Sequence, residues 1–113
     1  MSKAGLEMLT KAAALEYAPF GIRVNAVAPS VVETNLYRYS GYNEREQYLL
    51  RRRAASKNPL KRLVFPEEVG RAVTFLTSDK ADGITGHIMK IDGGKTLTQL
   101  GYVDWYGMEY MDR

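Results

Sequence analysis

The chain has no cysteine and a single histidine, His87. A disulfide framework is therefore excluded, and a zinc site of cysteine and histidine ligands cannot be assembled, so we expect no metal site. No apolar run approaches the ~18 residues of a membrane span, and the first residues lack the charged start and apolar block of a signal peptide. We therefore expect a soluble, cytoplasmic protein that has no membrane partner.

The excess of positive over negative charge is also small. Sixteen Lys and Arg against thirteen Asp and Glu give a formal net charge of +3, whereas nucleic-acid binding usually needs a concentrated basic surface. Nucleic acid is therefore not an expected partner. The sharpest basic run, residues 51–53 with the nearby Lys57, Lys61 and Arg62, could meet a phosphate or an acidic carrier, but the solvated face of a helix is the simpler interpretation.

The composition that remains is that of a folded globule, with 45% hydrophobic and 26% charged residues in a chain of 113, enough for one domain or part of one. Apolar residues at helical spacing predict a first helix from Ser2 to Tyr17, which Pro19 and Gly21 end. This helix is apolar almost all round, which predicts burial on two sides, between a sheet and another element. Residues 22–28 predict a short strand of a parallel sheet, closed by Pro29.

The segment 30–58 is polar and aromatic, and we expect a long excursion over a cleft that includes a helix over residues 44–56. Pro66 and two carboxylates predict the start of another helix, with a buried stripe at Val69, Ala72, Val73 and Leu76. A second strand, residues 87–91, ends at a turn over residues 92–94.

Two strands joined through helices are most simply parallel neighbours with a right-handed crossover. A sheet of two strands is marginal by itself in water. The sequence therefore predicts an α/β fold that is incomplete in this chain.

Six segments, in this order and at plausible spacing, resemble the short-chain dehydrogenases/reductases: residues 2–5 (SKAG), 21–29 (GIRVNAVAP), 31–34 (VVET), 66–69 (PEEV), 84–86 (ITG) and 92–94 (DGG). The resemblance implies the C-terminal portion of a Rossmann-like, doubly wound parallel sheet, with residues 1–97 as the C-terminal half of an oxidoreductase domain and residues 98–113 as an aromatic tail. The carbonyl/xylulose reductase-like and 3-oxoacyl-carrier-protein reductase-like branches are the nearest in pattern.

By the same resemblance, the complete protein transfers hydride between NAD or NADP and a small-molecule carbonyl or alcohol substrate, and it forms a homodimer or homotetramer. The family uses a tyrosine four residues before a lysine, and Lys3 matches that lysine, which implies a catalytic role and contact with the cofactor. The matching tyrosine position falls ahead of Met1, so we expect this chain alone to be inactive. Met1 as an internal residue of a longer protein is our preferred explanation.

The turn after the first strand carries the other predicted cofactor contacts, at Pro29, Ser30, Val32 and Thr34. The family usually has glycine where Ser30 stands. The resemblance implies that the backbone of Val32 holds the nicotinamide carboxamide and that Thr34 bonds carboxamide or pyrophosphate oxygens. A strand-to-loop turn in which Thr34 caps a helix is the simpler alternative.

Three further features are interpreted as structural. Asn25 lies in a strand, where its buried amide needs partners. The turn of Asp92, Gly93 and Gly94 follows the last strand and is predicted to open no helix, so it is not a phosphate loop. His87 has no companion ligand and is assigned no role.

The aromatic tail leaves two interpretations open. Its Tyr, Trp and Met residues are typical of an interface between subunits, but they could equally cover the half that this chain lacks. We keep one non-enzymatic alternative, in which the truncated chain is catalytically inactive and acts as an oligomerisation or interaction module.

Overall fold

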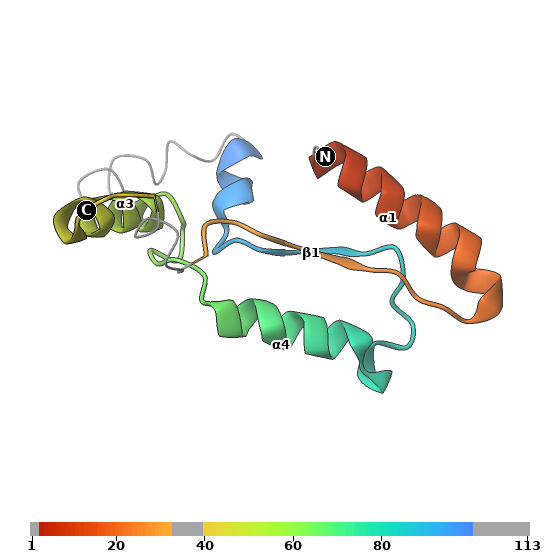
Figure 1. Cartoon of the computed structure of the whole chain (residues 1–113). Helices are drawn as coiled ribbons and strands as arrows, with labels where there is room; N and C mark the ends of the chain where they lie inside the picture. Colours follow the sequence, from red (N-terminus) through yellow and green to blue (C-terminus); the bar gives the residue numbers. More distant parts are fainter. Residues whose placement is uncertain (1–2, 33–39, 101–113) are drawn as a thin grey trace. The chain divides into compact units, whose positions relative to one another are not determined.

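A computed structural model describes residues 3–32 and 40–100 (Figure 1). The elements, in chain order, are α1 (Lys3–Tyr17), η1 (Ala18–Phe20), β1 (Ala26–Pro29), α3 (Glu44–Ser56), α4 (Pro66–Thr77), η2 (Asp79–Ala81), β2 (Ile88–Ile91) and η3 (Lys95–Leu100), where η marks a 3-10 helix. The chain forms two compact units: residues up to 28 with 69–90, and residues 29–68 with those from 91 onward. The predicted helix α3 is confirmed at both ends, and the predicted start of α4 at Pro66 is confirmed.

The centre of the first unit is the pairing of β1 with β2. The amide of Ala26 donates to the carbonyl of His87 (2.9 Å), and the amide of Gly86 donates to the carbonyl of Val24 (2.7 Å). Donors and acceptors advance in the same direction along both segments, so the strands are parallel, as predicted.

Strand β1 begins later than the sequence predicts, at Ala26 rather than residue 22. The reason lies in the partner segment, where Gly86 has a φ of +73° and interrupts the extended backbone before β2. The amide of Val24 therefore donates to the Thr85 hydroxyl oxygen (3.1 Å) instead of a backbone carbonyl. Pro29 is the last residue of the strand and not the residue after it.

Asn25 has the structural role that we predicted. Its Nδ2 donates to the carbonyl of Ile84 (2.9 Å), and its Oδ1 accepts from the amide of His87 (2.9 Å). The side-chain amide thus replaces the backbone pairing that the bend at Gly86 removes, and no polar atom of this amide is left without a partner.

Arg23 joins the entrance of β1 to the end of α4. Its guanidinium donates to the carbonyls of Leu76 (2.7 Å), Ile84 (3.1 Å) and Ser78 (3.3 Å). The last carbonyls of a helix lack partners within the helix and carry the negative end of its dipole. A cation bonded to them stabilises this end of α4 and fixes it beside β1.

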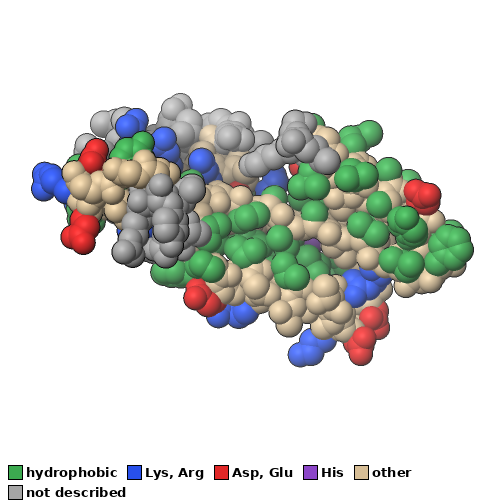
Figure 2. All heavy atoms as spheres, viewed as in Figure 1, with side chains coloured by type: hydrophobic (Ala, Val, Ile, Leu, Met, Phe, Trp, Pro, Cys, Tyr) green, Lys and Arg blue, Asp and Glu red, His purple; other side chains and the backbone are tan. Residues whose placement is uncertain are grey.

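Helix α1 packs on one side only. Thr10 and Ala14 are each 5% exposed, whereas Met8 is 70% and Leu15 is 79% exposed. Burial on two sides is therefore wrong for the described part of this chain, because no described element covers the second face. Apolar side chains are open to solvent over much of the face in view in Figure 2.

In the second unit, α3 begins at a capping box. The amide of Glu46 donates to Asn43 Oδ1 (2.8 Å), and the amide of Asn43 donates to Glu46 Oε1 (3.1 Å), which satisfies two free amides of the first turn. Arg52 and Arg53 are exposed, in agreement with a solvated basic face.

The start of α4 is fixed by an ion pair. Both Arg62 guanidinium nitrogens donate to the Glu68 carboxylate (2.5 and 2.9 Å), and Glu68 Oε1 also accepts from the amide of Phe65 (3.0 Å). The hydrogen bond to Glu68 raises the pKa of Arg62. Arg62 is thus paired and does not add to a free basic surface.

Two turns of the second unit lie against each other. Asn58 is 1% exposed and donates from Nδ2 to the carbonyl of Arg62 (2.8 Å), and the amide of Leu60 donates to the carbonyl of Gly93 (3.0 Å). A Cβ atom at Gly94 would lie 3.0 Å from a ring carbon of Pro59, and Gly94 has a φ of +89°. A side chain at Gly94 would therefore require the Pro59 ring to shift by a few tenths of an ångström.

We expect Gly94→Ala to destabilise the protein by about 1 to 3 kcal/mol, because it combines a strained backbone with a close contact. Gly70→Ala is the matched control, since Gly70 lies inside α4 with no atom within 4 Å of an added Cβ. That change should stabilise by about 0.5 to 1 kcal/mol. Urea unfolding followed by circular dichroism measures both, and equal effects of the two substitutions would contradict the packing described.

Candidate functional site

The carboxyl end of β1 carries three of the predicted cofactor contacts. Pro29 ends the strand, and Val32 forms an isolated parallel bridge with Val64. The amide of Val64 donates to the carbonyl of Val31 (3.3 Å). In open parallel α/β sheets, ligands bind in the crevice outside the carboxyl ends of the strands.

Ser30 supplies a polar atom without a partner at this position. Its Oγ is buried and has no hydrogen-bond partner within residues 3–32 and 40–100. A buried hydroxyl without a hydrogen bond costs about 1 to 3 kcal/mol, and such atoms often lie where a bound group is absent. The residues present at the end of β1 therefore fit a ligand that accepts or donates a hydrogen bond there.

The structure brings together only part of the predicted site. Pro29, Ser30 and Val32 adjoin one another in the second unit. Lys3 is the first residue of α1 in the first unit, and its side chain lies outside the described residues. Thr34, with the rest of residues 33–39, also lies outside them.

The turn after β2 is held by the carboxylate of Asp92. Asp92 Oδ1 accepts from the amide of Gly94 (2.9 Å), and Oδ2 accepts from the amide (3.1 Å) and hydroxyl (2.5 Å) of Thr96. The interpretation as a turn is supported, but the expectation that no helix follows is wrong, because η3 begins at Lys95. These bonds to Asp92 satisfy amides at the start of a short 3-10 helix, which the sequence pattern did not show.

The same bonds set the ionisation of Asp92. Burial raises the pKa of the carboxyl group, but the hydrogen bonds from Thr96 and Gly94 lower it by more, so the pKa lies below its ordinary value. A carboxylate with a lowered pKa stabilises the fold at neutral pH, and this contribution is lost as the pH falls through the lowered pKa.

We therefore expect Asp92→Ala to destabilise the protein at pH 7 and to have a much smaller effect at an acidic pH below the lowered pKa, where the wild-type carboxylate is protonated as well. Urea unfolding at both pH values measures the difference. Asp82→Ala is the matched control, since Asp82 is exposed and should change stability little at either pH. A loss that stays the same at both pH values would contradict the role of the charge.

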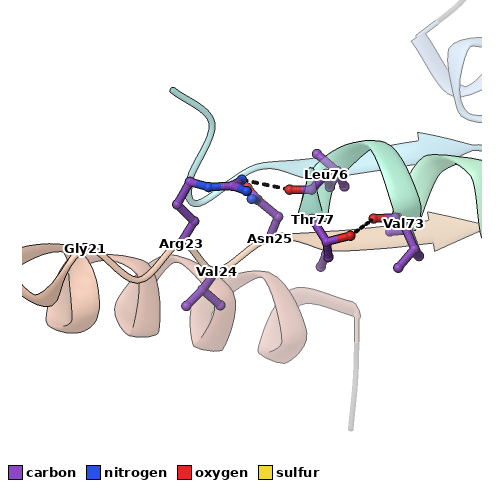
Figure 3. Close-up of a pocket in the computed structure, with 9 residues that line it drawn as sticks. Gly21, Arg23, Val24, Asn25, Val73, Leu76 and Thr77 are labelled. Carbon is purple, nitrogen blue, oxygen red and sulfur yellow. Dashed lines mark hydrogen bonds between the residues drawn. The ribbon is translucent and has the colours of Figure 1, made fainter. Parts of the chain in front are cut away.

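A pocket in the first unit was not anticipated from the sequence (Figure 3). Its volume is about 580 Å³, and it lies along β1 beside the last turns of α4. Its lining residues are Gly21, Arg23, Val24, Asn25, Ala26, Val27, Val73, Leu76 and Thr77. Val73 belongs to the predicted buried stripe of α4, yet it is 43% exposed, because the pocket leaves this side of the stripe uncovered.

Within residues 3–32 and 40–100, no group of three or more His, Cys, Asp or Glu side chains could hold a metal ion. None of the helices in the same ranges is both long and apolar enough to cross a bilayer.

Comparisons with known proteins extend these observations. The sequence model of the family described as enoyl-(acyl carrier protein) reductase matches residues 1–96. The chain is 43% identical over 95 residues to cis-4-hydroxycyclohexanecarboxylate dehydrogenase of Sinomonas cyclohexanicum, covering 84% of this chain and 36% of that protein. It is 41% identical over 96 residues to glucose 1-dehydrogenase 2 of Bacillus subtilis, and the match covers 85% of this chain and 35% of that protein.

Among solved structures, a short-chain dehydrogenase family protein of Francisella tularensis superposes with a TM-score of 0.72 at 36% identity, over 84% of this chain and 41% of that one. The fold is therefore Rossmann-like. The chain belongs to the short-chain dehydrogenase/reductase family of oxidoreductases. It spans little more than a third of the length of the curated relatives that it matches.

Proposed function

We propose that the chain is the C-terminal part of an NAD(P)-dependent oxidoreductase, with residues 1–97 in the catalytic domain and residues 98–113 as a tail. The observation that carries this proposal is the carboxyl end of β1, where a segment that resembles the family's nicotinamide-binding turn contains the buried Ser30 hydroxyl, which has no hydrogen-bond partner among the described residues. Among the family's branches, we favour the carbonyl/xylulose reductase-like and 3-oxoacyl-carrier-protein reductase-like ones.

The proposed contacts divide between two places in the chain. Pro29, Ser30, Val32 and Thr34 would hold the nicotinamide end of the cofactor, which supplies or accepts a hydride when bound. Lys3 would reach the ribose hydroxyls and lie one helical turn after the family's tyrosine. Lowering the pKa of a phenol from ~10 to ~7 requires about 4 kcal/mol, and a nearby ammonium can supply much of this energy.

The substrate class that we propose is a small molecule with an alcohol or carbonyl group. The relatives support it, since one is named for a hydroxycyclohexanecarboxylate and another for glucose, and both compounds carry hydroxyl groups. By family resemblance, the complete protein would be a homodimer or homotetramer.

A second candidate function is that of an oligomerisation or interaction module without catalysis. The exposed apolar face of α1, with Met8 and Leu15 more than two-thirds open to solvent, supports it. This candidate requires a stable oligomer that has no affinity for nicotinamide cofactors.

A chimera separates the two candidates. The upstream part of the Bacillus subtilis glucose 1-dehydrogenase 2 is joined ahead of this chain, so that a tyrosine stands four residues before Lys3. We expect NAD(P)-dependent turnover of glucose by the folded chimera, and Lys3→Ala should lower the rate by about 100-fold or more, because proton transfer loses its assistance.

Lys11→Ala is the matched control for that chimera, since Lys11 is an exposed lysine of the same helix and should leave the rate unchanged. Equal rates for the Lys3 and Lys11 variants would contradict the role of Lys3. Absence of turnover in a chimera that folds would leave the interaction module as the better candidate.

We expect substitution of Ser30 to raise the stability of the chain alone but to weaken cofactor binding by the chimera. In the chain alone, Ser30→Ala should stabilise the fold slightly, because it removes a buried polar atom that has no hydrogen bond. In the chimera, the same change should weaken NADH or NADPH binding by about 3- to 30-fold, since a hydrogen bond of about 1 to 2 kcal/mol is lost. Fluorescence titration of the cofactor measures the second effect, and unchanged binding would exclude Ser30 from the site.

A further inference from the structure

Two aspartates of the chain are directly followed by glycine, Asp82 by Gly83 and Asp92 by Gly93. In such a pair the amide nitrogen of the glycine can attack the carboxyl carbon of the aspartate, because glycine has no side chain to obstruct the approach. The attack expels water and closes a succinimide ring. Water then opens the ring at either carbonyl carbon, which gives back aspartate or gives isoaspartate, whose backbone runs through the side-chain carbons.

The turn at Asp82 is open to this reaction. Asp82 and Gly83 are both exposed, and a Cβ atom added at Gly83 would meet no atom within 4 Å. The backbone bonds of the turn join the amides of Asp82 and Ile84 to the carbonyls of Asp79 (3.2 Å) and Ala81 (2.9 Å). Neither bond uses the Asp82 carboxylate or the Gly83 amide, so these bonds hold neither reacting group.

The pair of Asp92 and Gly93 has the same chemistry but is held in place. The buried Asp92 carboxylate accepts from the amide of Gly94 and from the amide and hydroxyl of Thr96. A Cβ atom at Gly93 would lie 3.2 Å from Asn58, so this turn is closely packed. The lowered pKa of Asp92 also keeps its carboxyl group ionised, and a carboxylate is a weaker electrophile than a carboxylic acid.

Isoaspartate at residue 82 would disturb contacts beyond its own turn. Ile84 stands two residues later, and its carbonyl accepts from the guanidinium of Arg23 (3.1 Å) and from Asn25 Nδ2 (2.9 Å). An additional methylene group in the backbone at residue 82 displaces the residues that follow. The bonds that join the entrance of β1 to the segment before β2 therefore depend on an unmodified Asp82.

We propose that Asp82 is a modification site that isomerises spontaneously to isoaspartate, whereas Asp92 stays intact in the folded protein. The reaction forms a bond between the Gly83 nitrogen and the Asp82 carboxyl carbon and breaks a carbon–oxygen bond of that carboxyl group. The Gly83 amide proton leaves with the hydroxyl group as water, and a second water opens the ring. The product weakens the contacts of Ile84, so the modified chain unfolds more readily than the unmodified one.

Incubation in heavy-oxygen water measures both aspartates in one sample, because each opening of the succinimide ring adds one solvent oxygen. The folded chain is kept in this water at neutral pH for several weeks and is then digested with trypsin in ordinary water, which places the two aspartates in separate peptides, residues 81–90 and 91–95. We expect about 10- to 100-fold more label at Asp82 than at Asp92, since hydrogen bonds to a charged group must break before Asp92 reacts.

Two controls test the cause of the difference. In urea, both aspartates should take up label at similar rates, because each is followed by glycine and neither turn is formed. In the folded chain, Gly83→Ala should reduce the label at Asp82 by about tenfold or more, since a methyl group obstructs the attacking nitrogen. The added methyl group meets no atom within 4 Å, so the variant should fold. Gly70→Ala, which is equally free of close contacts, is the matched control and should leave the label unchanged.

Three results would overturn the proposed site. They are equal labelling of both aspartates in the folded chain, an Asp82 that takes up label in urea but not in the folded chain, and a Gly83→Ala chain that is labelled as fast as the wild type. The first two comparisons use the wild-type chain alone, so they hold whether or not the variant folds.

The effect on stability is measured on the same aged sample. A brief protease pulse in moderate urea digests the unfolded molecules, and chromatography of the tryptic peptides of the survivors separates isoaspartate from aspartate at residue 82. The survivors should contain less isoaspartate than the sample before the pulse, and equal contents would contradict the weakened contacts of Ile84. None of these measurements uses a nicotinamide cofactor, so their outcome is independent of the proposed activity.

Discussion

The described structure depends on the parallel pairing of two strands of four residues each. Backbone bonds between them bring residues more than sixty positions apart into contact, as for Ala26 with His87. Two short strands offer little apolar surface, so the pairing is extended by side chains. Asn25 continues it where the backbone bends, and Arg23 connects it to the end of α4.

The same pairing determines where the polar residues that follow the two strands lie. Because both strands run in one direction, their carboxyl ends lie together, and the chain leaves β1 through Ser30 and β2 through Asp92. The two ends differ in the hydrogen bonds that their polar side chains form. The carboxylate of Asp92 accepts hydrogen bonds on both oxygens and stabilises a turn, whereas the buried hydroxyl of Ser30 has no hydrogen-bond partner among the described residues.

Several apolar groups of the described residues are exposed. Within residues 3–32 and 40–100, no strand pairs with the second edge of β1, Val73 borders an open pocket, and Met8 and Leu15 of α1 face solvent. Large apolar surfaces of this kind usually mark contacts with other polypeptide. Membership of the family together with coverage of about a third of its relatives is consistent with that interpretation.

The amino-acid pattern was sufficient for features with local causes. Helix α3 has the predicted bounds and α4 has the predicted start, because an asparagine cap, a proline in the first turn and apolar spacing all act within a few residues. The motifs also identified the family. Features that depend on distant partners needed the folded chain. Strand β1 starts at Ala26 because Gly86 bends the other strand, and the pocket forms where β1 lies beside the last turns of α4. Helix η3 begins where Asp92 accepts from Thr96. Such contacts join residues far apart in sequence, and local spacing carries no record of them.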